Sequence, residues 1–326
     1  MNINSLRIIY MGTPEFAVAP LQKILEEGCN VVAVITAPDK PSGRGKKIKY
    51  SAVKQFTLDI DSTIPILQPT NLKDQDFVND LNKLQPDLQV VVAFRMLPEV
   101  VWRIPVLGTF NLHASLLPQY RGAAPINHAI INGESVTGVT TFMIDEKIDT
   151  GNILLQEKST IGELDNAGEL HDRLMNLGAN LVYETIHRLE AGNLNAQSQE
   201  DLKSNHDNLK TAPKIFKEHC RIPWGHQGIK VHNLIRGLSP SPGAFTFLER
   251  SESKLVLCKI FSSTFEPSVH CQPPGSIQSD GKRNLKVAVL DGYIHIGSIQ
   301  QEGKRRMDVG DFLAGINLSS EPYRFS

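Results

Sequence analysis

The first half of the chain alternates apolar runs with amphipathic stretches, as an α/β domain does. Apolar runs of strand length cover residues 6–11, 31–37, 88–94 and 108–113. Apolar residues recur at helical spacing over residues 15–27, 77–84 and 166–189. Strands that alternate with helices form right-handed βαβ units, which build a parallel sheet with ligands at the carboxyl ends of its strands. We therefore expect a Rossmann-like, parallel-sheet α/β domain.

The second half changes to short β-type runs after a polar segment. Residues 191–212 are rich in Asn, Gln, Ser and Asp and fit an interdomain linker better than a core element. A helix is expected at 231–238. Beyond it, β-type runs separated by Pro-Gly and Asp-Gly cover 244–248, 255–261, 285–290 and 293–299. This pattern predicts a small OB-like β-barrel. The predicted domains are 1–190 and 213–326, with the linker at 191–212.

Composition narrows the class of protein. The chain has 326 residues, of which 40% are apolar, so it suits two ordinary hydrophobic cores. No apolar run approaches the roughly 18 residues of a membrane-spanning helix, and the first residues do not resemble a secretion signal. Four scattered cysteines without a C-x-x-C pair argue against a structural zinc site and for a reducing compartment. We expect a cytoplasmic protein with no membrane partner, and expect it to be a monomer.

The two halves differ in charge. Residues 210–326 hold 16 Lys and Arg against 10 Asp and Glu, a net of +6, whereas residues 1–209 carry −7. A basic module beside an acidic one favours a polyanionic partner, because Lys and Arg displace the counterions of phosphates. A solvated basic face without a partner is the alternative interpretation.

The turn after the first apolar run carries one glycine. Gly12-Thr13-Pro14 stands where dinucleotide-binding folds have G-x-G-x-x-G. The turn that encloses a pyrophosphate is therefore missing, and we expect no nicotinamide cofactor.

A basic segment at 38–49 follows the second apolar run. It contains Arg44, Lys46 and Lys47 and would lie beside the carboxyl end of the sheet. One interpretation is a loop that grips a phosphate backbone, with Arg44 inserted into a nucleic-acid substrate. The other is a solvated loop, and composition alone favours neither.

Asn111 and His113 end the run at 108–113 and form a candidate catalytic pair. The two-residue period of a strand puts both side chains on the same side. An amide and an imidazole that project together can bind an oxygen that gains charge during acyl transfer. Asp149 could orient His113 or raise its pKa if the fold brings the two together. The alternatives are a structural histidine and an ordinary Asp-Thr-Gly turn.

At these residues the chain resembles a known family, the formyltransferases that use 10-formyltetrahydrofolate, and among them the methionyl-tRNA formyltransferases. The resemblance extends over the whole chain. The motifs that carry it are Gly12-Thr13-Pro14-Glu15-Phe16-Ala17, Gly43-Arg44-Gly45-Lys46-Lys47, Asn111-x-His113-x-Ser115-Leu116-Leu117-Pro118, Tyr120-Arg121-Gly122-Ala123-Ala124-Pro125-Ile126 and Asp149-Thr150-Gly151.

The resemblance implies roles for individual residues. Asn111, His113 and Asp149 match the family's catalytic trio, and Arg44 matches the loop arginine that senses the acceptor end of the tRNA. The residues that match its folate-binding stretches are Ser115, Leu116, Leu117, Pro118, Phe94, Met96 and Leu97. The chain departs from the family at Ala114 and at Arg95, where glycine is usual.

The implied function is transfer of a formyl group from 10-formyltetrahydrofolate to the α-amine of initiator methionyl-tRNA, for translation initiation. In this mechanism Asn111 and a protonated His113 stabilise the developing charge, Asp149 keeps His113 charged, and no metal takes part. Remote phosphate contacts are expected from Lys304, Arg305 and Arg306, and further tRNA contacts from Lys46 and Lys47 in the basic segment at 38–49. The alternatives are a formyltransferase for a sugar nucleotide or glycinamide ribonucleotide, and a non-catalytic RNA-binding protein.

Overall fold

The computed structural model describes residues 5–42, 47–202, 208–249, 255–316 and 323–326, and the chain forms two compact units. Unit 1 comprises residues 1–122, 137–159 and 171–211, and unit 2 comprises 123–136, 160–170 and 212–326. The second unit thus includes two short segments that lie between stretches of the first unit in the sequence. The predicted domain boundaries at 190 and 213 stay a prediction.

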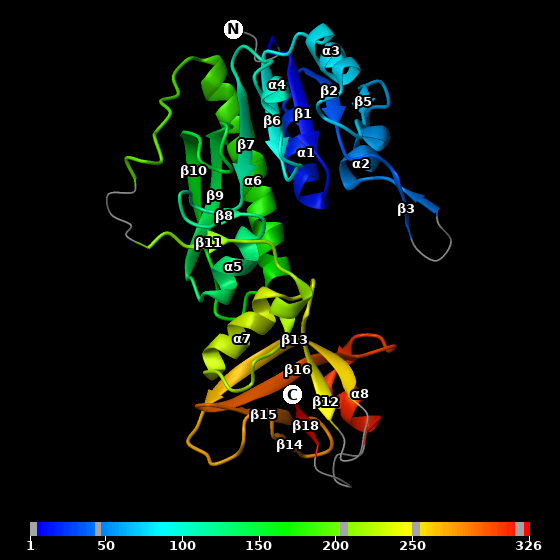
Figure 1. Ribbon diagram of the computed structural model, residues 1–326, viewed down its shortest axis with the longest axis vertical. Helices are drawn as coiled ribbons and strands as arrows, with labels where there is room; N and C mark the ends of the chain where they lie inside the picture. Colours follow the sequence, from blue (N-terminus) through cyan, green and yellow to red (C-terminus); the bar gives the residue numbers. More distant parts are fainter. Residues whose placement is uncertain (1–4, 43–46, 203–207, 250–254, 317–322) are drawn as a thin grey trace. The chain divides into compact units, whose positions relative to one another are not determined.

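Unit 1 is built on a seven-stranded sheet (Figure 1). In spatial order its strands are β10 (Ile153–Thr160), β9 (Val136–Met143), β7 (Thr109–His113), β6 (Leu88–Val92), β1 (Ile8–Gly12), β2 (Val31–Ile35) and β5 (Ile66–Leu67). The five strands from β7 to β5 pair in parallel, and β9 runs antiparallel to β7. The chain lays β2 and β5 on one side of β1 and then β6 and β7 on the other. Open α/β sheets bind ligands at such a reversal, outside the carboxyl ends of the strands.

Helices cover both faces of this sheet. These helices are the 3-10 turn η1 (Glu15–Ala17), α1 (Val18–Glu26), α2 (Ala52–Ile60), α3 (Gln75–Lys83), α4 (Glu99–Trp102) and α6 (Ala167–Glu190). Side chains of α3 and α4 pack with Ile9, Met11 and Val91 on one face. On the other face α6 lies so close to β7 that a Cβ at Gly178 would stand 2.6 Å from Leu112. Small elements complete the unit: β3 (Lys40–Ser42), β4 (Lys47–Lys49), β8 (Arg121–Gly122) and β11 (Thr211–Ala212).

The predicted α/β architecture is confirmed. Every strand and helix expected from periodicity in the first half is present, with its ends shifted by a few residues. The sequence did not indicate the hairpin β9–β10 or helices α2 and α5 (Pro125–Ile131). In β9 the run of threonines hides the apolar alternation, although all but its end residues are buried.

Unit 2 contains an antiparallel sheet of order β14-β15-β16-β13-β12-β18, with β17 paired to β16. The elements are η3 (Lys217–Cys220), α7 (Gly228–Gly237), β12 (Ala244–Glu249), β13 (Val256–Pro267), β14 (Ile277–Ser279), β15 (Leu285–Val289), β16 (Gly292–Gln301), β17 (Met307–Asp308), α8 (Val309–Ala314) and β18 (Arg324–Phe325). An isolated bridge between Ser276 and Arg324 brings the two edges of the sheet together, which nearly closes it. Trp224 fills the core by stacking on Phe325 at a centroid distance of 5.7 Å. The small antiparallel barrel predicted from the sequence is confirmed.

Within the described ranges, none of the helices combines the length and the apolar character needed to cross a lipid bilayer.

Gly138 should be essential for the close approach of β9 and β10. A Cβ at this position would stand 2.1 Å from the carbonyl oxygen of Glu157 and 2.6 Å from Leu116. We expect Gly138→Ala to lower the free energy of unfolding by about 1–3 kcal/mol in urea denaturation, because the backbone must move. Gly225→Ala is the control, since nothing lies within 4 Å of its added methyl group. Equal stability of the two variants would contradict this reading of the hairpin.

Candidate active site

Asn111 and His113 project from β7 on the face opposite the one that Leu112 turns to α6, as the two-residue period predicts. Asn111 lies between Val91 of β6 and Phe142 of β9 and is half-buried. Within the described residues no hydrogen bond is found for its side-chain amide. This amide is therefore free to bind a substrate oxygen.

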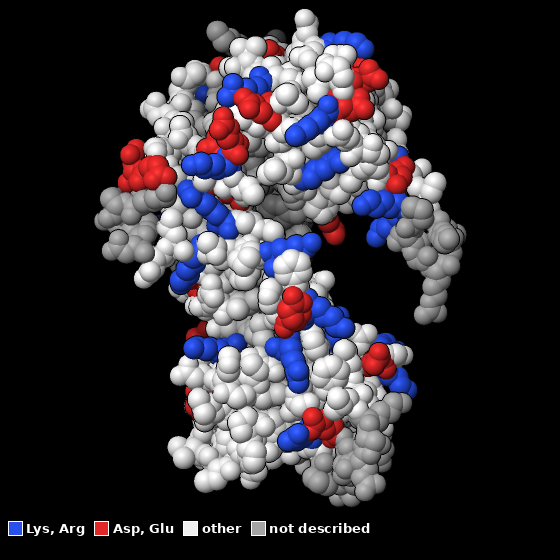
Figure 2. Space-filling model, viewed as in Figure 1, with Lys and Arg blue, Asp and Glu red and all other residues white. Residues whose placement is uncertain are grey.

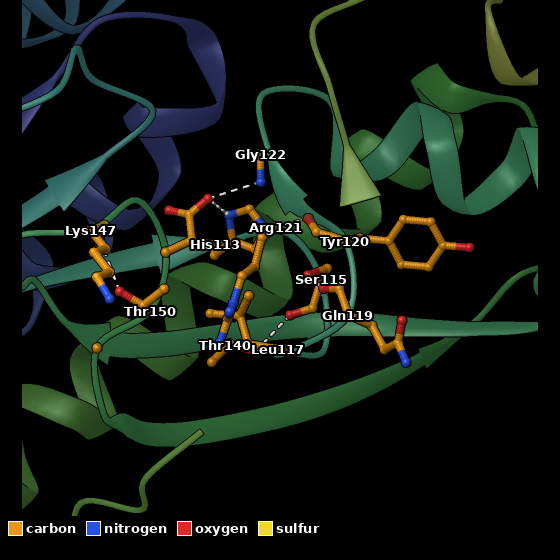
Figure 3. A network of polar contacts seen from close by, with 12 residues as sticks. His113, Ser115, Leu117, Gln119, Tyr120, Arg121, Gly122, Thr140, Lys147 and Thr150 are labelled. Carbon is orange, nitrogen blue, oxygen red and sulfur yellow. Dashed lines mark hydrogen bonds and ion pairs between the residues drawn. The ribbon is translucent and has the colours of Figure 1, made fainter. Parts of the chain in front are cut away.

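One ring nitrogen of His113 makes a hydrogen bond, and the other faces a carboxylate (Figure 3). Its Nε2 lies 2.9 Å from the carbonyl oxygen of Tyr120, and its Nδ1 lies 3.9 Å from Oδ2 of Asp149. A carbonyl oxygen can only accept, so Nε2 carries a hydrogen and donates it. In the neutral imidazole the lone pair is then on Nδ1, the nitrogen on the side of Asp149.

Asp149 reaches His113 from the loop between β9 and β10. Its Oδ2 also accepts a hydrogen bond of 2.9 Å from the backbone N–H of Gly122. Asp149 and Tyr120 both have left-handed backbone conformations, with φ of +55° and +60°. Such conformations cost of order 1–3 kcal/mol for residues other than glycine and persist where the surroundings impose them. Two strained loops therefore meet at His113.

Burial dominates the electrostatics of His113, which is only 6% exposed. Burial lowers the pKa of His113 below its ordinary value of 6.5; the Asp149 carboxylate and the Tyr120 carbonyl oppose the shift, while the Arg121 cation adds to it. The imidazole is therefore neutral at pH 7 in the free protein. Asp149 acts on this pKa in the expected direction, but burial has the larger effect in the free protein. The expectation that Asp149 favours the charged ring during the reaction stays a prediction.

The stretch Ser115–Pro118 forms the buried base of the loop after β7. The Ser115 hydroxyl donates to the carbonyl of Gln119 at 2.6 Å, and the carbonyl of Ser115 accepts from Thr140 Oγ1 at 2.6 Å. Leu117 packs in a small core cluster with Phe142 and Ile153. Pro118 and Ala114 are buried as well, and Leu116 is half-buried. These residues hold the loop in shape rather than present an open surface.

The residues after β6 lie at the reversal of strand order. Ala93 has φ of +46°, Met96 is 77% exposed, and Leu97 is buried in the core with Phe94 packed against it. The Arg95 guanidinium donates to the backbone carbonyls of Thr70, at 2.9 Å, and Pro69. The extra side chain at this departure from the family pattern is thus tied to the loop after β5.

The predicted tRNA-binding residues fall into three groups. Arg44 and Lys46 lie outside the described residues, and Lys47 begins β4, where it pairs with Ser42. Lys304 and Arg305 are exposed in the turn between β16 and β17. Arg306 donates to Ser298 Oγ at 2.8 Å and lies over the ring of Phe261, so it is held to the barrel. Figure 2 shows basic side chains scattered over the visible face of unit 2, with acidic ones between them, rather than one patch.

Sequence reasoning missed three features of the site. The carbonyl of Tyr120, the charge of Arg121 and the buried amide of Gln199 all act on the trio or on its loop. Tyr120 and Arg121 stand in a motif that the sequence did single out, but a backbone carbonyl leaves no signal in a sequence. Gln199 lies in a polar segment that resembles a linker. Among the described residues, no group of three or more His, Cys, Asp or Glu side chains is arranged to hold a metal ion.

Comparisons with known proteins point to one family. Residues 6–186 match the model of the formyl transferase family, and residues 214–317 match that of the formyl transferase C-terminal domain. A protein of Bacteroides fragilis named methionyl-tRNA formyltransferase is 52% identical over 319 residues, covering 98% of each chain. Relatives of the same name in Flavobacterium johnsoniae and Porphyromonas gingivalis are 52% and 47% identical, covering 98% and 99% of this chain and 99% of each relative.

Solved structures with a similar fold are more distant. WlaRD, a sugar 3N-formyl transferase solved in the presence of dTDP and 5-N-formyl-THF, gives a TM-score of 0.63 at 20% identity, over 92% of this chain and 99% of that one. HypX from Aquifex aeolicus, in complex with tetrahydrofolic acid, gives 0.61 at 16% identity over 95% of this chain and 48% of that one. At these identities the likeness establishes the fold alone.

We expect the His113 imidazole to titrate below pH 6.5 in the free protein, and Asp149→Asn to lower its pKa further, because the carboxylate opposes the shift caused by burial. NMR titration of the His113 ring in the unchanged protein and in the Asp149→Asn variant measures both. The unfolded chain binds this proton more readily than the folded one, so the free energy of unfolding falls as the pH drops from about 6.5. A pKa of His113 above 6.5 would contradict the assignment of a neutral resting imidazole.

Proposed function

The chain belongs to the formyltransferase family, with the methionyl-tRNA formyltransferases, and from this premise we propose that it transfers a formyl group from 10-formyltetrahydrofolate to the α-amine of initiator methionyl-tRNA. The observation that carries the proposal is the free amide of Asn111 beside an imidazole whose reactive nitrogen is fixed. A free amine can attack a formyl carbon without a covalent enzyme intermediate. The site then has two tasks, to stabilise the formyl oxygen and to move a proton.

Asn111 performs the first task. Its side-chain N–H groups have no partner among the described residues, so they can donate to the formyl oxygen as it gains negative charge. His113 cannot do this from Nε2, because that hydrogen is given to the carbonyl of Tyr120. At the start of the reaction, charge stabilisation in the trio rests on Asn111.

His113 performs the second task through Nδ1. The neutral ring takes the proton that the attacking amine loses, and the resulting imidazolium faces the Asp149 carboxylate at 3.9 Å. The charged ring then returns this proton from Nδ1 to the departing nitrogen as the bond between that nitrogen and the formyl carbon breaks. Asp149 thus favours the charged ring during the reaction, while burial keeps the ring neutral at rest.

The residues after β6 fit a flat, partly apolar ligand with amide-like edges. Met96 and Ala93 present apolar surface to solvent at the reversal of strand order, and Phe94 is half-exposed. No hydrogen bond is found for the backbone N–H groups of Phe94 and Met96 within the described part of the chain. Unpaired peptide groups and an apolar surface suit a folate-derived donor, which supplies the formyl carbon. We assign its binding to residues 93–97, together with the stretch 115–118 that the family resemblance implies.

The basic second unit supports a polyanionic acceptor. Lys304 and Arg305 are exposed, positively charged and distant in the protein sequence from the catalytic trio. Such side chains suit phosphate contacts that do not depend on the nucleotide sequence. Arg306 keeps its contact with Ser298 and contributes less. A role for Arg44, Lys46 and Lys47 at the acceptor end of the tRNA remains part of this proposal.

Formyl incorporation into charged initiator tRNA tests the function directly. We expect Asn111→Ala to lower kcat by roughly 100-fold with the KM for the folate donor nearly unchanged, because a transition-state donor is lost. Asn193→Ala, which alters an exposed asparagine, is the control. Normal turnover by a folded Asn111→Ala variant would overturn the mechanism. Transfer to an amino-sugar nucleotide but not to methionyl-tRNA would overturn the proposed acceptor.

Removing charge from unit 2 should weaken tRNA binding without slowing the chemistry. We expect Lys304→Ser with Arg305→Ser to raise the KM for tRNA and to lower its salt dependence by about one unit of slope for each lost phosphate contact, with kcat at saturation unchanged. Lys73→Ser with Lys83→Ser removes the same charge from unit 1 and should change little. An equal effect of the two pairs would show that only net charge matters.

A further inference from the structure

We propose that Gln199 is a positioning residue for the formyl transfer, because its buried side chain joins the Asp149 turn to the Arg121 guanidinium. This inference rests on the proposed function, since it assigns to Gln199 a part in the work of the same trio. Gln199 lies in the polar segment that the sequence predicted to be a linker, and nothing in its local pattern indicates a role.

The side chain of Gln199 is fully engaged. Its Nε2 donates to the backbone carbonyls of Asp149, at 3.1 Å, and Gly151, at 2.7 Å. Its Oε1 accepts from Nε of Arg121, at 3.1 Å, and from Nη2 of the same residue, at 2.5 Å. Gln199 is only 2% exposed. An amide this deeply buried must satisfy its donors and acceptor within the protein.

The partners fix the orientation of the amide and require this residue type. Carbonyl oxygens only accept and a guanidinium only donates, so a flipped amide would set donor against donor and acceptor against acceptor. A glutamate could accept from Arg121 but could not donate to the two carbonyls in its ionised form. A lysine could donate but could not accept. Of these side chains, only an amide of this length serves both sides.

Gln199 binds the backbone of Asp149 and the guanidinium of Arg121, and the charges of these two residues act on the pKa of His113. Asp149 raises the pKa of His113 and Arg121 lowers it, while the carbonyl of Tyr120 accepts a hydrogen bond from the ring. Gln199 binds the backbone of the strained Asp149 turn, whose φ is +55°, and so opposes its relaxation. The carboxylate of Asp149 can then keep its distance to Nδ1 of His113 through the reaction.

The chain around Gln199 is held to the same unit. Gln197 and Ile153 exchange two backbone hydrogen bonds of 2.8 Å, and Leu202 packs against the cluster of Leu117 and Phe142. The segment that ends at residue 202 is therefore bridged to Ile153 at the start of β10, and it belongs to unit 1. Gln197 itself is exposed, so its side chain takes no part in these contacts.

A double-mutant cycle tests the proposal. Gln199→Met keeps the length of the side chain and removes all four hydrogen bonds, whereas Gln197→Met makes the same change at an exposed position. We expect Gln199→Met to lower kcat by about 10- to 100-fold with little change in the KM for either substrate, since small displacements of catalytic groups have effects of this size. In single-turnover assays on the Asp149→Asn background, the same change should lower the rate by less than about threefold, because the group it positions is already gone.

A second variant and a second measurement keep the test decisive. Gln199→Glu retains the acceptor for Arg121 and loses the donors to the Asp149 turn, so it should lower kcat as Gln199→Met does. Hydrogen exchange at the Gly122 amide, which donates to Asp149, should be faster in both Gln199 variants and unchanged in Gln197→Met. Amides in β6 should exchange at the same rate in all variants.

The outcomes separate the two proposals. Equal losses of rate in the wild-type and Asp149→Asn backgrounds, normal kcat in folded Gln199 variants, or unchanged exchange at Gly122 would each overturn the role of Gln199. Failure of the wild-type protein to formylate methionyl-tRNA would overturn the proposed function instead. The exchange measurement needs no activity, so it would still decide whether Gln199 holds the turn.

Discussion

The hydrogen bond from Nε2 of His113 to the carbonyl of Tyr120 determines how the rest of the site can work. Because it fixes the ring hydrogen on Nε2, the reactive lone pair is on Nδ1, facing Asp149. It also keeps the ring from stabilising a developing oxyanion through Nε2, which leaves that task to Asn111. A left-handed backbone at Tyr120 supplies the carbonyl, so one strained residue divides the chemical roles between two side chains.

The sheet and its loops hold His113 where burial and the Asp149 carboxylate have opposite effects on its charge. β7 fixes Asn111 and His113 between β6 and β9, while the loops that carry Tyr120 and Asp149 are joined by the bond from Gly122 to Asp149. Burial disfavours charge on His113 and the nearby carboxylate favours it. The balance leaves a ring that is neutral at rest and gains stabilisation when it accepts a proton, as a general base requires.

The sequence predicts the architecture and the trio for clear physical reasons. It does not reveal the burial of particular residues, also for physical reasons. Periodicity locates β7, and the two-residue repeat puts Asn111 and His113 on one side. Motif spacing relates Asp149 to them only through the resemblance to a family, since contact across the loops depends on the fold. Periodicity could not reveal the burial of His113 in three dimensions, which reverses the expected direction of its pKa shift. Nor could it reveal Gln199, because a polar residue in an aperiodic segment gives no sign of burial.

The interleaved course of the chain has a consequence for any attempt to divide it. Unit 2 includes residues 160–170. The buried Arg236 donates to the carbonyls of Gly162 and Asp165 in this segment, and His232 meets the carbonyl of Glu163. A fragment that begins at residue 213 would keep Arg236 and its hydrogen bond to Asn233 but lose the carbonyl acceptors of Gly162 and Asp165, which leaves part of a buried guanidinium unsatisfied. A protease cut within 191–212 would differ, because both pieces would still be present and those bonds could hold them together. The structure of unit 2 can therefore survive a broken peptide bond but not the loss of its short segments. A chimera that exchanges unit 2 between relatives would have to include residues 123–136 and 160–170.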